Sequence, residues 1–139
     1  MKPFRDWILG IDFIYPLLHG NLTQWDTFRS AARPHHLGLD ICGKVGDEAL
    51  CCFPGKIGNI YQSAPPGGMT VEVLNSDENT MATYSHLDKV IVTKGQEVVI
   101  GQVLGVLAGL PVDKPRPHIH FQIRVWIDPE ETLRIPKKW

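Results

Sequence analysis

The sequence predicts an all-β fold, a compact antiparallel barrel or sandwich of short strands with a short, partly helical N-terminal segment. Segments rich in β-branched residues recur along the chain, and turn-forming residues separate them, which is the pattern of short strands. The chain has 13 glycines and 11 prolines, numbers that indicate many turns rather than disorder. Its 139 residues suffice for one domain with a single hydrophobic core.

The individual elements follow from composition and period, and helix is expected to be scarce. Strands are expected at residues 54–63, 70–75, 81–87, 89–95, 97–107 and 118–127. The stretches 65–68 (PPGG) and 75–79 (NSDEN) read as turns, and 110–117 (LPVDKPRP) is expected to form a proline-stiffened surface loop.

One segment near the N-terminus, residues 21–32 (NLTQWDTFRSAA), favours a short amphipathic helical turn. Asn21 or Thr23 can cap its start. Its apolar residues are Leu22, Trp25 and Phe28.

The charge balance and the apolar runs exclude several classes of partner. The formal net charge is −1, so no nucleic-acid surface and no patch for an anionic membrane is indicated. The apolar run from Trp7 to Leu18 is interrupted by Asp12 and Pro16, so we interpret it as part of the folded protein rather than as a signal peptide. No stretch approaches the roughly 18 to 20 apolar residues that a membrane-spanning helix needs, so no transmembrane segment is expected.

The three cysteines, Cys42, Cys51 and Cys52, are an odd number in a chain long enough to fold without disulfides. We expect them to behave as small buried hydrophobic residues. The alternative is a single bridge from Cys42 to Cys51 or Cys52.

The segment PHIHFQIR places His118 and His120 two residues apart in an expected strand. Residues i and i+2 of a strand face the same side, about 6.5 to 7 Å apart, so two imidazoles can converge on one site. A chance pair is a serious rival, because the chain contains 6 histidines. Further residues are therefore needed to indicate a function.

The segment HHLGLDI supplies a second pair, His36 and Asp40. On a straight strand their Cα atoms would lie about 13 Å apart, too far to share an ion, but Gly38 between them permits a bend. One imidazole and one carboxylate, joined by an imidazole from a distant strand, make a three-ligand zinc set. Such a set leaves the fourth tetrahedral position for water, as catalytic zinc sites do.

Four ordered motifs then resemble the lysostaphin-type zinc endopeptidases of bacterial cell walls, whose fold is of the duplicated hybrid motif type. The motifs are HLGLD at 36–40, YSHL at 84–87, KGQEV with GQVLG at 94–105, and PHIHF at 117–121. The resemblance runs from about Pro34 to Leu133. It implies that His36, Asp40 and His120 bind Zn²⁺, and that His86 and His118 lie beside the metal-activated water and handle protons. It leaves open which of the two is the base.

The resemblance also implies the substrate, the place of action and the organisation of the chain. The family cleaves peptide bonds of peptidoglycan, either stem cross-links or glycine-rich bridges, so a periplasmic, cell-surface or secreted location is expected. Residues 34–139 are expected to form the peptidase-like domain, with 1–33 as an extension packed on it; the oligomeric state stays open. One departure from the family pattern is that no tyrosine occurs between Tyr15 and Tyr61, where members often carry one that assists the oxyanion.

Two other functions are compatible with parts of the same sequence pattern. A catalytically silent relative would bind cell wall or activate another hydrolase, although such proteins commonly lack zinc ligands. A histidine phosphocarrier of the glucose enzyme IIA type shares a similar barrel and a His-x-Gly-x-Asp stretch. That carrier needs two facing histidines for a phosphoryl group, which matches the five residues less well.

Overall fold

The computed structural model describes residues 3–5, 12–14, 21–24, 39–64, 67–76, 80–109 and 117–125, and of residues 3–39 the backbone alone. These ranges contain strands, turns and loops but no helix, and thus none that could span a bilayer. The strands are β1 (Pro3–Arg5), β2 (Asp12–Ile14), β3 (Asn21–Gln24), β4 (Leu39–Cys42), β5 (Glu48–Leu50), β6 (Gly55–Gln62), β7 (Met69–Asn75), β8 (Thr80–Asp88), β9 (Glu97–Val98), β10 (Val103–Leu107) and β11 (His118–Val125).

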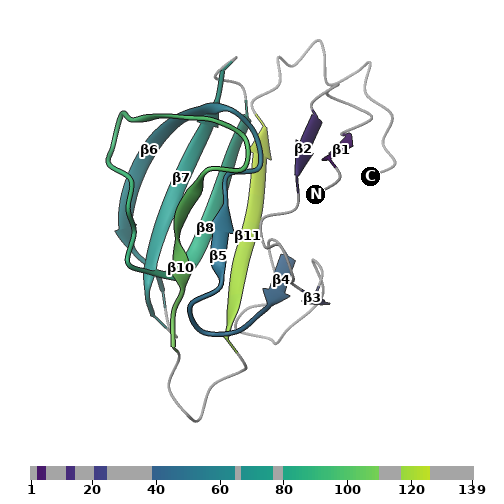
Figure 1. The fold of residues 1–139 in the computed structure, drawn as a ribbon, viewed down its shortest axis with the longest axis vertical. Helices are drawn as coiled ribbons and strands as arrows, with labels where there is room; N and C mark the ends of the chain where they lie inside the picture. The colour runs from purple at the N-terminus through teal and green to yellow at the C-terminus, as the bar shows by residue number, and fades with distance from the viewer. Residues whose placement is uncertain are drawn as a thin grey trace.

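The main sheet is antiparallel and runs in the order β3-β4-β11-β8-β7-β6-β9. β10 pairs with both β5 and β8, while β1 and β2 form a separate pair. Figure 1 shows β6, β7, β8 and β11 side by side in a curved layer, with β5 and β10 across one face of it. The all-β antiparallel prediction is therefore confirmed.

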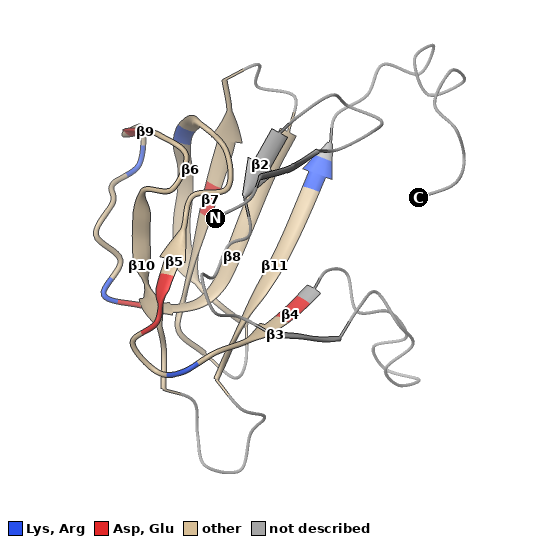
Figure 2. Cartoon of the chain, turned by 45° about the vertical axis from the view of Figure 1, so that its right-hand side comes forward, with Lys and Arg blue, Asp and Glu red and all other residues tan. Residues whose placement is uncertain are grey.

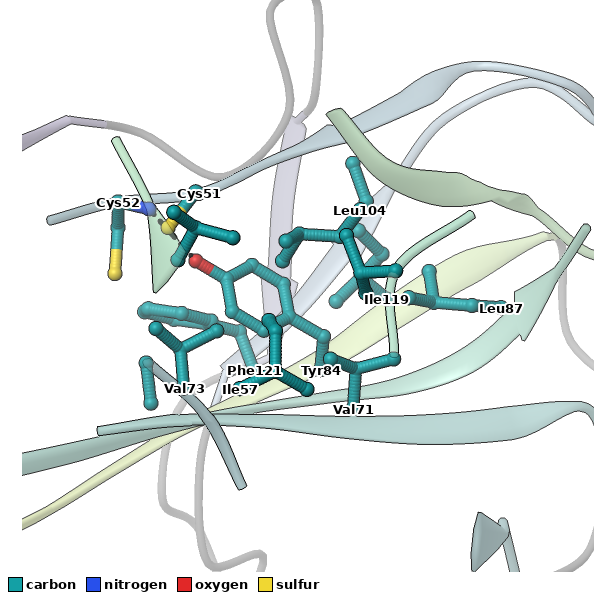
Figure 3. Packing of buried hydrophobic residues seen from close by; sticks show 14 of the residues in the cluster. Cys51, Cys52, Ile57, Val71, Val73, Tyr84, Leu87, Leu104, Ile119 and Phe121 are labelled. Atoms are coloured by element: carbon teal, nitrogen blue, oxygen red, sulfur yellow. Dashed lines mark hydrogen bonds between the residues drawn. The ribbon is translucent and has the colours of Figure 1, made fainter. Parts of the chain in front are cut away.

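The core fills the space between the curved layer and the β5–β10 pair. In β7, β8 and β11, alternate residues point to this core, as the two-residue period of a strand requires. Tyr84 of β8, for example, pairs with Val71 on one side and Phe121 on the other, and its ring meets that of Phe121 edge to face at 5.2 Å. The buried cluster, much of which Figure 3 shows, comprises Ile41, Ala49, Cys51, Cys52, Phe53, Ile57, Val71, Val73, Ala82, Tyr84, Leu87, Val92, Val98, Leu104, Leu107, Ile119 and Phe121.

Two of the expected strands differ in the structure. The segment 89–95 forms no strand, because its backbone bonds to two different neighbours: the Ile91 N–H donates to Leu104 and the Gly95 N–H donates to Ile57. The segment 97–107 is divided into β9 and β10 by a turn, in which the Gln102 N–H donates to the Val99 carbonyl. In the first segment tertiary neighbours override the strand pattern, and in the second a local turn interrupts it.

The helical turn expected at 21–32 is wrong at its start, because residues 21–24 are strand β3. Asn21 pairs with Cys42 and Leu22 with Ile41, and a register shift follows between Leu22 and Gln24. Edge pairing with β4 outweighs the weak helix preference of four residues. Residues 25–32 lie outside the described residues.

Two of the three cysteines are buried as expected, whereas Cys42, at the strand edge of the site, is only partly buried. All three are free thiols, and Cys51 and Cys52 are fully buried. Burial raises the pKa of Cys51 to about 11 and that of Cys52 to about 12. Both are therefore unreactive packing residues, and the alternative of a disulfide with Cys42 is wrong.

The fully buried Tyr84 binds the segment between β5 and β6 through one hydrogen bond, which Figure 3 shows. The Cys52 N–H donates to the Tyr84 hydroxyl at 2.8 Å. Tyr84→Phe is expected to lower the free energy of unfolding by about 1 to 3 kcal/mol, because it leaves a buried N–H without its acceptor. Urea denaturation measures this change.

Tyr61→Phe is the matched control, because Tyr61 is 45% exposed, and it should change the free energy of unfolding by no more than about 0.5 kcal/mol. Equal losses in both variants would contradict the role of the buried hydrogen bond.

Candidate metal and catalytic site

The candidate site lies where β4, β11 and β8 run side by side. Asp40 of β4 pairs with His120 of β11, and His120 pairs on its other side with Ser85 of β8. His118 pairs with Cys42 one step further along. Because paired residues share a face and faces alternate, these side chains lie on the face opposite the core. Their neighbours Ile41, Ile119 and Phe121 point into the core, as the sequence pattern around Asp40 predicts for Ile41.

Asp40 stands between the two imidazoles of the His-x-His pair. Its Oδ1 lies 3.3 Å from Nδ1 of His120 and 3.9 Å from Nε2 of His118. Asp40 and His118 are each only 6% exposed, so both groups are shielded from bulk water. A nearly buried carboxylate with two histidines beside it indicates a site rather than an exposed strand face.

A β-bulge in β8 brings His86 to the same site. Val71 of β7 pairs with Tyr84 and Met69 pairs with Leu87, so β8 has one more residue than β7 in this interval. Such a bulge re-aims a side chain. As a result, the ring of His86 lies 5.0 Å from that of His118, centroid to centroid, in an edge-to-face arrangement.

The surroundings of His86 favour its neutral form. Burial lowers its pKa from the ordinary value of 6.5, and the nearby His118 and His120 lower it further. The hydrogen bond to Gly67 and the charge of Asp40 act in the opposite direction. Because desolvation is the largest cause, the net pKa shift is downward, which suits a group that accepts a proton near neutral pH.

The structure brings together Asp40, His86, His118 and His120, from the five residues that the sequence predicted. The fifth, His36, lies outside the described residues. Within the part of the chain that is described, no three His, Cys, Asp or Glu side chains surround a common point for an ion. The ligand set of the sequence analysis therefore stays a prediction, with two of its members facing each other.

The charged residues of the described ranges do not form a block of one sign. Figure 2 shows basic and acidic residues as separate short segments, mostly in loops and at strand ends. Asp40 in β4 and Glu72 in β7 are charged residues within strands. No charged surface thus competes with the histidine site as the functional feature of these ranges.

Comparison with known proteins identifies the family of the chain. The model of peptidase family M23 matches residues 34–132. This chain belongs to peptidase family M23. The matched range contains all five predicted site residues, and membership excludes the phosphocarrier alternative.

Two curated relatives of this M23 chain differ in what their names describe. Peptidoglycan DD-endopeptidase ShyB of Vibrio cholerae is 32% identical over 99 residues, which cover 71% of this chain and 22% of that protein. Murein hydrolase activator NlpD of Escherichia coli is 26% identical over 100 residues, covering 71% of this chain and 25% of that protein. The chain thus spans about a quarter of the length of these relatives.

Solved structures show the same M23 fold. The catalytic domain of lysostaphin from Staphylococcus simulans superposes with a TM-score of 0.68 at 24% identity, covering 81% of this chain and 86% of that domain. A zinc-containing peptidase from Vibrio cholerae gives a TM-score of 0.69 at 23% identity, with 80% and 36% of the two chains covered. The resemblance to lysostaphin-type peptidases is therefore confirmed.

Three residues of the site were not singled out from the sequence of this M23 chain. Ser63, Gly67 and Gly68 surround His86: the Ser63 hydroxyl accepts its backbone N–H, and the Gly67 carbonyl bonds its ring. The sequence feature that could have indicated Gly67 and Gly68 is the PPGG stretch, which predicted a turn at this position. Nothing in the local pattern indicated that this turn meets a histidine about 20 residues away.

Proposed function

We propose that this chain is a zinc-dependent endopeptidase that hydrolyses peptide bonds of bacterial peptidoglycan. The observation that supports this most is the convergence of Asp40, His86, His118 and His120 on one sheet face in a member of peptidase family M23. Three imidazoles and a carboxylate supply both metal ligands and proton-transfer groups. A purely structural role would not require four nearly adjacent polar side chains from three strands.

Zinc is the metal that this donor set suits best. Asp40 offers a carboxylate oxygen, and the His120 nitrogen that faces it is Nδ1. Oxygen and imidazole donors of this kind are common zinc ligands. His36 is proposed as the third protein ligand, on the basis of the sequence motif. When bound, zinc supplies a water of lowered pKa and polarises the carbonyl group of the bond to be cleaved.

The two remaining histidines are proposed to handle protons. His86 and His118 lie ring against ring, and both are nearly buried. A neutral imidazole can accept the proton of the attacking water, and an imidazolium can return one to the leaving amine. Asp40, beside both histidines of β11, helps to hold their orientation through its Oδ1.

The names of the relatives support a proposal for the substrate and the place of action. ShyB is by name a peptidoglycan endopeptidase, so we propose peptidoglycan peptides as the substrate of this chain. Action on peptidoglycan requires a periplasmic, cell-surface or secreted location. We also keep the division into an extension, residues 1–33, and a peptidase-like domain, residues 34–139, as a proposal.

An activator without catalysis is the second candidate function. It is favoured by the 26% identity to a protein named murein hydrolase activator NlpD. The two functions differ in zinc chemistry, because an activator needs no bound metal and no proton-transfer histidines. The presence of His118 and His120 beside Asp40, with His86 against His118, supports the enzyme.

Metal removal tests the proposed function directly. The purified chain is expected to contain one zinc ion and to release soluble peptides from isolated peptidoglycan. Dialysis against a chelator should abolish this release, and added zinc should restore it. No cleavage of any peptidoglycan, combined with stimulation of an added murein hydrolase, would instead support the activator.

A further inference from the structure

His86 has an unusual backbone conformation for a residue in a strand. Its φ angle is 69°, in the left-handed region that only His86 and Lys89 occupy among the described non-glycine residues. Such a conformation costs of order 1 kcal/mol or more and persists where the surroundings impose it. His86 is also the bulge residue that faces His118. The contacts that impose this conformation are therefore part of the site.

Hydrogen bonds hold the backbone of His86 on both sides. Its N–H donates to the Ser63 hydroxyl at 3.0 Å, and its carbonyl accepts the Ala108 N–H at 3.1 Å. The first of these is a side-chain contact, so it depends on the identity of residue 63. A serine or threonine provides the acceptor, whereas alanine does not.

The Ser63 hydroxyl is itself bonded to the Thr70 hydroxyl, which bonds in turn to that of Ser85. The Thr70 hydroxyl donates to Ser85 at 3.0 Å, so the Ser63 hydroxyl donates to Thr70 at 2.8 Å. Ser85 lies opposite His120 in the sheet register. The chain of hydroxyls thus extends from the backbone of His86 to the strand position beside the predicted zinc ligand.

The ring of His86 is fixed by the Gly67 carbonyl. Nδ1 lies 2.6 Å from that oxygen. A carbonyl oxygen can only accept, so Nδ1 must carry a proton. In the neutral ring the other nitrogen, Nε2, then has a free lone pair. The contact therefore selects the tautomer whose Nε2 can accept a proton.

Gly68 provides the space for this arrangement. A Cβ atom at Gly68 would lie 2.8 Å from the Cα of His86 and 2.9 Å from its carbonyl carbon, distances that real Cβ atoms do not adopt. Its φ angle of +83° is also one that residues with a side chain rarely adopt, so glycine is favoured here. Any side chain at this position would push the turn and the His86 backbone apart.

We propose that Ser63, Gly67 and Gly68 are positioning residues that hold His86 in its left-handed conformation and in the Nδ1–H tautomer, so that Nε2 is its proton-accepting nitrogen. This inference rests on the proposed function for its catalytic meaning, and it assigns His86 the role of proton acceptor in the reaction. The tautomer itself is a property of the folded chain that can be measured without any substrate.

The tautomer is measured by NMR on zinc-loaded protein labelled with ¹⁵N-histidine, with the His86 signals assigned by their loss in His86→Gln. Wild-type His86 is expected to show a protonated Nδ1 and an unprotonated Nε2. In Ser63→Ala and Gly68→Ala, part of the population is expected to shift to the Nε2–H form. A wild-type spectrum in which Nε2 carries the proton of the neutral ring would overturn the proposal.

Activity provides the second readout, with matched variants. Ser63→Ala should lower kcat by about tenfold and Gly68→Ala by about 10- to 100-fold, with zinc content retained and KM changed less than about twofold. Ser63→Thr keeps the hydroxyl and should restore most of the rate. Gly95→Ala is the control for Gly68→Ala, because its φ of +85° is nearly equal but no atom lies within 4 Å of the added Cβ.

The outcomes separate this inference from the proposed function. If the wild type cleaves peptidoglycan but Ser63→Ala and Ser63→Thr have equal kcat values, the positioning role is wrong and the enzyme stands. If the wild type shows the Nδ1–H tautomer but cleaves nothing, the proposed function fails and the positioning role stands. The comparison of Ser63→Ala with Ser63→Thr tests the positioning role even if Gly68→Ala does not fold.

Discussion

The His118→Ala variant is expected to keep its zinc and to lose peptidoglycan hydrolysis by a factor of about 10² to 10⁴, the usual contribution of a proton-transfer group. His118 lies against His86, at a ring distance of 5.0 Å, and is nearly buried. Its removal takes away one imidazole but leaves the predicted ligands in place. Zinc per chain is measured by plasma mass spectrometry, and hydrolysis by the soluble peptides released.

Variants of the predicted zinc ligands are expected to behave differently from His118→Ala. Asp40→Ala and His120→Ala are expected to lose both zinc and activity, because each removes a metal donor. The assignment within the His-x-His pair is open to a direct challenge, since Nε2 of His118 lies only 3.9 Å from the same Asp40 oxygen. If His118→Ala loses zinc while His120→Ala retains it, the two histidines have exchanged roles.

Leu104→Ala is expected to lower the free energy of unfolding by about 2 to 5 kcal/mol. Leu104 of β10 is fully buried in the core that joins the β5–β10 pair to the main sheet. The substitution removes the transfer free energy of three carbon atoms and leaves a cavity that a closely packed core closes only in part. Chemical denaturation gives the magnitude, and a lower Tm is expected with it.

A nearby exposed residue gives the matched control for this loss. Ile91 is 65% exposed, and its backbone N–H donates to the Leu104 carbonyl. Ile91→Ala removes a similar number of carbon atoms without opening a core cavity, so a change within about 0.5 kcal/mol is expected. Similar losses in the two variants would contradict the description of the core.

Several features were determined by the sequence alone. The two-residue period and the turn chemistry predicted β6, β7, β8 and β11, because these properties are local. The spacing of the His-x-His pair predicted that His118 and His120 face the same side, since residues two apart in a strand point the same way. The motifs that resemble lysostaphin-type peptidases predicted the family that the comparisons show.

Other features were decided only by tertiary structure. The segment 89–95 has the composition of a strand, yet its backbone groups find partners in two separate places, at Leu104 and Ile57. The bulge that aims His86 exists because β8 holds one more residue than β7 in the same interval, a property of two strands together. The turn at Gly67 reaches the ring of His86 across 19 positions of sequence. Local propensity contains no information about such contacts, because they form only when distant segments pack against each other.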